Sequence, residues 1–178
     1  MSNIMHSSRT DCCGTPKSVL NLVHEVLGQI DLDPASDWRF NINVQATHHI
    51  TEKENGLVKP WPTGCTVFLN PPGGKVGRKS KTALFWQRLI EYRQSGSLNH
   101  AIFLAFSLEA LQVTQSCDLS IGDFPFCVPS SRMRFESPEG VPGDAPTHSN
   151  AIVYVPGIID NTVMFRRAFS KLGKVIGA

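Results

Sequence analysis

The stretch Thr66-Val67-Phe68-Leu69-Asn70-Pro71-Pro72-Gly73-Gly74-Lys75 governs the interpretation of this 178-residue chain. Its first four residues are apolar or β-branched without alternation, which predicts a short strand buried in a parallel sheet. The two prolines cannot continue a strand, because they lack an N–H and have a fixed φ. The two glycines then allow another molecule to approach the backbone closely. The stretch therefore predicts a strand that ends abruptly and holds Asn70 at the carboxyl edge of a sheet, where ligands of open α/β sheets bind.

The residues Asn70, Pro71 and Pro72 suit a particular reaction. The exocyclic amine of a nucleobase is a poor nucleophile, because its lone pair is delocalised into the ring. The amide oxygen of Asn70 and the carbonyl oxygen of Pro71 would accept its two N–H bonds, and the prolines would hold that carbonyl rigid. Two such acceptors favour a tetrahedral nitrogen as it attacks a methyl group. A plain strand followed by a Pro/Gly turn is the alternative interpretation, and companion motifs decide between the two.

The composition is that of an ordinary globular protein. Hydrophobic residues make up 41% of the chain, and 178 residues suit one domain with a core of reasonable size. The formal net charge of +2 is compatible with a nucleic-acid partner but too small to indicate one by itself. No apolar run approaches the ~18 residues of a membrane span, and residues 1–13 form a polar, flexible segment without a signal core. We therefore expect a soluble intracellular protein without a membrane partner.

No metal site is predicted. The five cysteines are odd in number and contain no Cys-x-x-Cys pair, which argues against structural zinc. The adjacent His48 and His49 would point to opposite faces of a strand and do not make a joint site.

The motif Gly14-Thr15-Pro16-Lys17 opens a predicted helix that ends at Gly28. Thr15 suits the N-cap and Pro16 the first helical position. A helix N-terminus that meets an anionic or carboxylate ligand is the functional alternative for Thr15.

Asp33 ends a predicted strand over residues 30–32, and small residues follow it at Pro34-Ala35-Ser36. An acidic residue at the end of the first strand is the usual way such sheets hold a cofactor's ribose or ammonium group. An Asx turn is the alternative interpretation. Because the full glycine fingerprint is missing, a standard dinucleotide site is not predicted.

Alternating strands and helices follow along the chain. Residues 66–69, 100–106, 124–129 and 151–155 are predicted strands, and residues 83–93, 107–111 and 160–172 are predicted helical segments. The strand–helix–strand–helix order predicts a parallel α/β unit. The loop between the last two strands predicts a terminal antiparallel pair, and residues 37–65 receive no firm assignment.

Two groups of polar residues flank the predicted site. The first occupies a loop that we expect to be flexible, and it consists of Lys75, Arg78, Lys79 and Lys81. The second lies around the last two strands, and it consists of Arg132, Arg134, His148 and Asn150. Phosphate contact suits the cations, and an adenine edge suits the asparagine. Solvated loops and strand ends remain the alternative interpretation.

The chain resembles the phage-associated Dam-type DNA N6-adenine methyltransferase family over residues 14–156, through motifs that occur in the same order. These are Gly-Thr-Pro-Lys (14–17), Leu-Asp-Pro-Ala-Ser (32–36), Asn-Gly-Leu…Trp (55–61), Phe-Leu-Asn-Pro-Pro (68–72) and Phe-Cys-Val-Pro-Ser-Ser-Arg…His-Ser-Asn (126–150). The resemblance implies an S-adenosylmethionine-dependent methyltransferase that acts on DNA in the cytoplasm of a bacterial host. It also implies one compact α/β domain, residues 14–178, with a Rossmann-like, mostly parallel sheet whose last strand is antiparallel.

The resemblance also implies roles for individual residues. The implied catalytic residues are Asn70, Pro71 and Pro72. The implied cofactor-binding residues are Thr15, Pro16, Asp33, Pro34, Ala35, Ser36 and Asn55. From charge and position beside the predicted site, rather than from the resemblance, we further expect nucleic-acid binding at Gly73, Gly74, Lys75, Arg78, Lys79, Arg132, Arg134, His148 and Asn150.

The chain departs from the family pattern at Gly73, where Tyr or Phe usually stacks on the target base. Another aromatic side chain would have to replace it, and the candidates are Phe68, Trp61, Trp86 and Phe106. This departure, together with a glycine-poor cofactor loop, leaves two further hypotheses. One is a catalytically degenerate module that binds nucleic acid or a protein partner. The other is a methyltransferase that acts on a free nucleotide.

Overall fold

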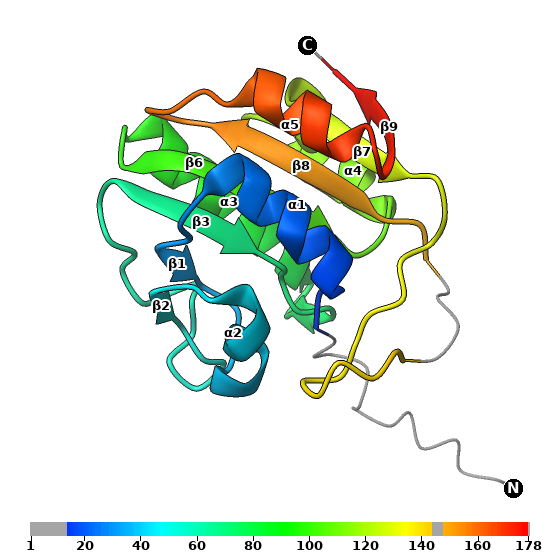
Figure 1. The fold of residues 1–178 in the computed structure, drawn as a ribbon. Helices are drawn as coiled ribbons and strands as arrows, with labels where there is room; N and C mark the ends of the chain where they lie inside the picture. Colours follow the sequence, from blue (N-terminus) through cyan, green and yellow to red (C-terminus); the bar gives the residue numbers. More distant parts are fainter. Residues whose placement is uncertain (1–13, 144–147, 178) are drawn as a thin grey trace, which may run out of the picture.

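Seven strands of the described chain form one mixed sheet between two layers of helices (Figure 1). The computed structural model describes residues 14–143 and 148–177. The strands of this sheet are β1 (Leu32–Asp33), β2 (His48–His49), β3 (Cys65–Leu69), β6 (Leu98–Ala105), β7 (Phe126–Pro129), β8 (Ala151–Pro156) and β9 (Gly173–Ile176). The helices are α1 (Lys17–Leu27), α2 (Trp38–Val44), α3 (Lys81–Gln94), α4 (Glu109–Val113) and α5 (Thr162–Phe169). The short strands β4 (Lys75–Val76) and β5 (Lys79–Ser80) make a separate hairpin.

The sheet has the order β2-β1-β3-β6-β8-β7-β9. Its first four strands are parallel neighbours, which confirms the predicted parallel α/β unit. The predicted antiparallel pair is also confirmed, because β7 and β8 are antiparallel. The antiparallel part is nevertheless larger than one last strand, since β8 inserts between β6 and β7 and β9 then pairs with β7. The expectation of a mostly parallel sheet therefore holds for only half of the strand pairings.

The strand order reverses between β1 and β3. From β1 the chain passes through α2 to the outer strand β2, and it then crosses back to pair β3 with the other side of β1. In open α/β sheets, ligands bind in the crevice outside the carboxyl ends of the strands at such a reversal. Here that point lies between Asp33, the last residue of β1, and Asn70, the first residue after β3.

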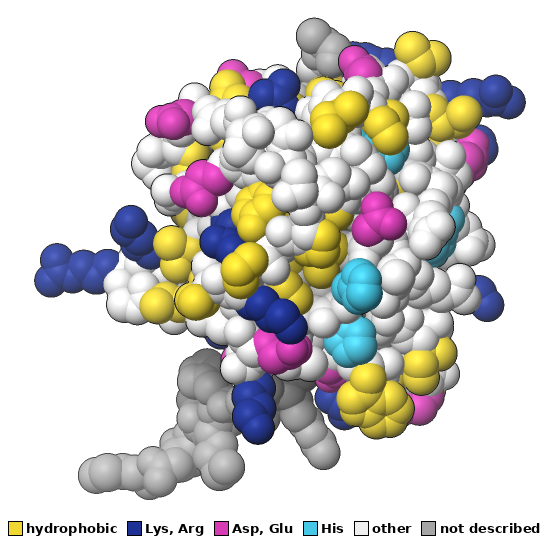
Figure 2. All heavy atoms as spheres, turned by 90° about the vertical axis from the view of Figure 1, so that its left-hand side faces the viewer, with side chains coloured by type: hydrophobic (Ala, Val, Ile, Leu, Met, Phe, Trp, Pro, Cys, Tyr) yellow, Lys and Arg dark blue, Asp and Glu magenta, His cyan; other side chains and the backbone are white. Residues whose placement is uncertain are grey.

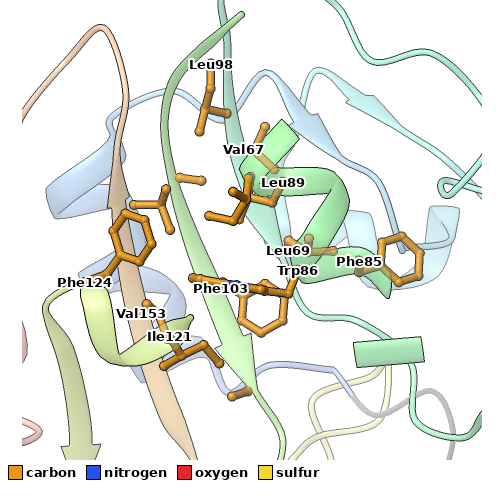
Figure 3. Close-up of a cluster of buried hydrophobic side chains, with 14 of the residues drawn as sticks. Val67, Leu69, Phe85, Trp86, Leu89, Leu98, Phe103, Ile121, Phe124 and Val153 are labelled. Carbon is orange, nitrogen blue, oxygen red and sulfur yellow. The ribbon is translucent and has the colours of Figure 1, made fainter. Parts of the chain in front are cut away.

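The two faces of the sheet are covered by separate hydrophobic clusters. One cluster joins α1 and α5 to Phe68, Ile102 and Leu104 of the central strands. The other joins α3 to Leu69 and Phe103 and contains the fully buried Trp86 (Figure 3). Successive residues of β3 and β6 thus alternate between the faces, as the pleat of a strand requires.

Two helix ends illustrate how local sequence sets the elements. Gly28 ends α1 as predicted, with a φ of +68° that favours glycine. Residues 38–44, which received no firm assignment, form α2 because Asp37 caps it and accepts hydrogen bonds from the Arg39 and Phe40 amides. None of the helices in the described part of the chain has the length and apolar character of a membrane span.

The face at the amino ends of the parallel strands carries basic, acidic and apolar side chains interspersed with one another (Figure 2). Such mixing agrees with the small net charge of +2. An anionic partner would therefore be attracted by local groups of cations rather than by the overall field of the molecule.

Candidate functional site

The Asn-Pro-Pro corner meets the residues before α1 at the carboxyl edge of the sheet. Asn70 is half-buried, and its Nδ2 donates a hydrogen bond to Oγ1 of Thr15 at 3.3 Å. Pro71 is buried and Pro72 is half-buried. The structure thus brings together one predicted catalytic and one predicted cofactor-binding residue that are 55 positions apart in the sequence. The amide nitrogen of Asn70 thus donates to Thr15, and the amide oxygen is the side-chain atom of Asn70 that can act as an acceptor.

Thr15 does not cap α1, so the prediction that it is the N-cap is wrong. The helix begins at Lys17, and Pro16 occupies the cap position without a side-chain cap. The carbonyl oxygen of Pro16 accepts hydrogen bonds from the amides of the next turn, at Val19 and Leu20. The buried side chain of Thr15 therefore makes no cap of α1, and its hydroxyl oxygen accepts the hydrogen bond from Asn70.

Asp33 lies at the neighbouring strand end and is only 3% exposed. Its Oδ1 accepts a hydrogen bond from the Ala35 amide at 3.1 Å, so the Asx turn considered from the sequence is present. Burial raises the pKa of Asp33 to about 7, and hydrogen bonds from the Ala35 amide and the Ser36 hydroxyl lower that pKa by less. The carboxyl group therefore changes its charge near neutral pH, a behaviour that is concentrated at functional sites.

The turn at residues 55–57 packs against the loop that follows Asp33, and Gly56 makes the close contact. Asn55 is exposed and has a φ of +61°, and its Oδ1 accepts a hydrogen bond from the Leu57 amide. A Cβ on Gly56 would lie 1.9 Å from the carbonyl oxygen of Pro34. Asn55 thus belongs to a turn that positions Pro34, and Gly56 is a site residue that our sequence analysis did not single out. A signal was present, because glycine directly follows a residue type that tolerates positive φ.

A Gly56→Ala substitution is expected to lower the free energy of unfolding by about 3 kcal/mol, because the new methyl group must displace the backbone of Pro34. It should also weaken any ligand that the Asp33 loop holds. Chemical denaturation monitored by circular dichroism measures the first effect. Gly122→Ala is the matched control, since its Cβ would meet nothing closer than 3.5 Å. Equal stability of both variants would contradict the close packing of Gly56 on Pro34.

The basic run after the corner is a hairpin rather than the flexible loop that we predicted. Strands β4 and β5 pair antiparallel, and the Lys81 amide extends the pairing to the Gly74 carbonyl at 3.0 Å. Gly77, one of the two residues between the strands, has a φ of +60°, which allows the tight reversal. The cations of the hairpin are exposed at Lys75, Arg78 and Lys79.

A cavity of about 740 Å³ lies behind the hairpin. It is lined by the three exposed cations of the hairpin, by α3 and by residues 112–118. Neither this cavity nor a smaller one of about 270 Å³ is lined by Asp33 or Asn70. The half-exposed Ala35, Ser36 and Asn70 instead lie at the surface of the sheet edge.

The second polar group lies on the other face of the sheet. Arg132, Arg134 and His148 are exposed, and Met133 between the two arginines packs into the cluster of α1 and α5. The hairpin instead precedes α3, which covers the opposite face. The two groups of cations therefore lie toward opposite faces of the sheet and do not merge.

Asn150 does not have the base-reading geometry that we expected. It is 2% exposed, and its Nδ2 donates to the Phe106 carbonyl at 2.6 Å while its Oδ1 accepts from the Met133 amide at 3.3 Å. Its amide thus joins the end of β6 to the segment after β7 and presents no edge to a base. Because buried polar groups need hydrogen-bond partners, the amide of Asn150 pairs with the backbone and holds these two segments together.

An Asn150→Ala substitution is expected to lower the free energy of unfolding by about 2 kcal/mol, because it leaves two buried backbone groups unpaired. Thermal or urea unfolding measures the loss. Asn21→Ala, on the exposed side of α1, should change stability by less than about 0.5 kcal/mol. If both variants unfold alike, the two hydrogen bonds of Asn150 do not stabilise the fold.

The described His, Cys, Asp and Glu side chains form neither a metal-binding group nor a reactive thiol site. Within residues 14–143 and 148–177, no group of three or more His, Cys, Asp or Glu side chains is placed to hold a metal ion. Burial raises the pKa of the Cys65 and Cys127 thiols to about 11, which leaves them unreactive at neutral pH. The segment 1–13, including Cys12 and Cys13, lies outside the described residues.

No protein-family model, curated protein or solved structure matches this chain. The residues at the sheet edge are therefore the basis for assigning a function.

Proposed function

We propose that this protein transfers a methyl group from S-adenosylmethionine to the N6 amine of adenine in DNA. The observation that carries the proposal is the contact of Asn70 with Thr15 at the carboxyl edge of the sheet. This contact lies where the strand order reverses, beside the buried Asp33 of the adjacent strand. The order of the first four strands and the antiparallel strands after them are compatible with the Rossmann-like fold that the resemblance implies.

In this reaction, the Asn-Pro-Pro corner would hold the target amine, and the residues around Asp33 and Thr15 would hold the methyl donor. Asn70 Oδ1 and the Pro71 carbonyl would accept the two N–H bonds of the amine and turn its lone pair toward the methyl donor. The buried Pro71 keeps its own carbonyl in place without a side-chain support. Asp33, Thr15 and the small residues after Asp33 would hold the cofactor, which supplies an electrophilic methyl group on a sulfonium. No general base is required before the attack.

DNA would reach this edge between the two groups of cations. Adenine N6 is inaccessible to an enzyme inside the base stack, so the target base has to leave the duplex. Exposed Lys75, Arg78 and Lys79 on one side, and Arg132 and Arg134 on the other, would contact phosphates around it. Their small number fits weak, salt-dependent binding.

Two measurements on the purified protein test the proposal. Calorimetry with S-adenosylmethionine measures cofactor binding directly, which matters because the two described cavities are not lined by Asp33. A methyl-transfer assay with labelled cofactor then compares duplex DNA, single-stranded DNA, adenosine and AMP. We expect cofactor binding and transfer to DNA. Transfer to AMP but not to DNA would favour a free-nucleotide enzyme.

The second candidate function is a methyltransferase-like module without turnover. The observations that favour it are Gly73 in place of an aromatic residue and the position of the 740 Å³ cavity away from Asp33. This candidate predicts no calorimetric signal with S-adenosylmethionine and retained binding of nucleic acid or a protein partner.

A further inference from the structure

We infer that Phe106, with His148 beside it, forms the platform on which the target base stacks in place of the aromatic residue missing at Gly73. The inference rests on the proposed function, because it describes how that site would hold its base. The rings of Phe106 and His148 contact each other, with their centroids 5.3 Å apart.

Burial excludes three of the four aromatic candidates. Phe68, Trp61 and Trp86 are 1%, 4% and 0% exposed, so their ring faces are covered by the core. The indole nitrogens of Trp61 and Trp86 also donate to backbone carbonyls, of Gly56 and Leu119 respectively. Phe106 is half-buried and is thus the one of these four candidates that the core does not fully cover.

The strand register places Phe106 on the same side of the sheet as Asn70. Strands β3 and β6 are parallel neighbours, with Leu69 opposite Phe103. Phe68 belongs to the cluster under α1, and Asn70 lies two positions further on, so alternation directs both to that face. Phe106 packs against the same cluster and follows β6 directly. The amide of Asn70 and the ring of Phe106 therefore leave adjacent strands on one face at one edge.

Hydrogen bonds hold this platform rigidly beside the Asn70 contact. Asn150 bonds to the backbone carbonyl of Phe106, and the Phe106 ring packs on Phe135 at 5.2 Å. The residue after Phe135, Glu136, exchanges two backbone hydrogen bonds with Gly14, both of 2.8 Å. Gly14 directly precedes Thr15, the partner of Asn70. A short series of bonded neighbours thus leads from the Phe106 ring back to the proposed catalytic amide.

The space beside Gly73 is open, as stacking of a base on Phe106 requires. A Cβ on Gly73 would meet no atom within 4 Å, so this side of the corner is open. A planar base whose amine bonds to Asn70 would find space there and a ring face at Phe106. His148 is exposed at the rim, where it would cover part of the base from solvent. Base–aromatic stacking tolerates any base, so selectivity for adenine would come from the amine acceptors.

The test uses a single-stranded thymidine dodecamer with one central 2-aminopurine. This isomer of adenine lacks the N6 amine, so it reports stacking separately from the amine acceptors, and its fluorescence is quenched when it stacks on an aromatic ring. Wild-type protein should quench the probe. Phe106→Leu should abolish the quenching and weaken binding about 5- to 150-fold. Phe106→Tyr should preserve both. Tyr92→Leu is the matched control, because it removes a half-buried ring at the end of α3, beside Trp61 and away from the carboxyl edge.

Two further variants keep the inference testable if Phe106→Leu folds poorly. His148→Ala alters an exposed side chain and should reduce quenching and binding several-fold. Gly73→Tyr in the Phe106→Leu background should restore quenching, because the open space at Gly73 accepts a side chain. Unchanged quenching in Phe106→Leu and His148→Ala would overturn the platform.

Methyl transfer measured in parallel separates this inference from the proposed function. If the wild type transfers methyl groups and Phe106→Leu leaves KM for DNA and probe quenching unchanged, the platform fails and the function stands. If the probe responses follow our expectation but the wild type neither binds S-adenosylmethionine nor transfers methyl groups, the function fails and the platform stands.

Discussion

Methyl transfer by an Asn70→Ala variant is expected to fall by at least about 100- to 1,000-fold, which is the usual effect of removing one preorganised hydrogen-bonding group from a reacting centre. Alanine lacks the amide oxygen that would accept an N–H bond of the target amine. Cofactor affinity should fall far less than transfer, because Asp33 and the residues after it are unchanged and Thr15 loses only its hydrogen bond from Asn70. The measurement is single-turnover transfer from labelled S-adenosylmethionine together with calorimetry of cofactor binding.

The control for Asn70→Ala is Asn99→Ala. Asn99 is a half-buried asparagine near the beginning of β6, at the opposite end of the strand from Phe106. Its removal should leave both transfer and cofactor binding unchanged. Undiminished transfer by Asn70→Ala would rule out the acceptor mechanism, and a loss of cofactor binding as large as the loss of transfer would show that Asn70 acts on the donor instead.

The central strand and its corner were predictable because their causes are local. Four apolar or β-branched residues, followed by Asn70 and two prolines, allow few other structures, and β3 indeed covers Cys65–Leu69 and ends directly before Asn70. Gly28 ended α1 for a similarly local reason. The pair β7 and β8 followed from two apolar runs joined by a loop of Pro, Gly and acidic residues.

Other features depend on contacts between distant parts of the chain, which a local pattern does not contain. Strand β9 exists because the edge of β7 offers it hydrogen-bonding partners, since its strand-favouring residues are only Val175 and Ile176, too short a run to predict a strand. Thr15 has the residue type of an N-cap, but its partner is Asn70, 55 positions away. Asn150 has the residue type of a base reader, but two backbone segments use both ends of its amide.

The affinity for S-adenosylmethionine is expected to fall about tenfold for each pH unit below about 7. The cause is Asp33, whose pKa is raised to about 7 by burial. Only the ionised carboxylate pairs with an ammonium group or accepts strongly from ribose hydroxyls, and its fraction falls tenfold per pH unit below the pKa. Calorimetric titrations between pH 5 and pH 8.5 measure the slope. Asp33→Asn should bind weakly at every pH and lose the slope.

Folding stability should respond to the same group with the opposite sign. Because the pKa of Asp33 is about 7 in the folded protein and 3.8 ordinarily, the folded state binds more protons between those values. The free energy of unfolding should therefore fall as pH rises from about 4 to 7, by on the order of 4 kcal/mol in total from this residue. Asp33→Asn removes the ionisable group and with it this fall in the free energy of unfolding. The variant should therefore be more stable than the wild type at pH 8, while its affinity for the cofactor is lower.

Asp123→Asn is the matched control for both slopes. Asp123 caps a 3₁₀ turn through hydrogen bonds with Ser120, which lower its pKa, and it lies in a segment packed on the α3 face. Its removal should leave the pH dependence of cofactor binding unchanged. A protein whose cofactor affinity is flat from pH 5 to pH 8.5, and whose Asp33→Asn variant gains no stability at pH 8, would contradict a buried, titrating Asp33. A variant that gains stability but keeps full cofactor affinity would instead show that Asp33 is buried without touching the donor.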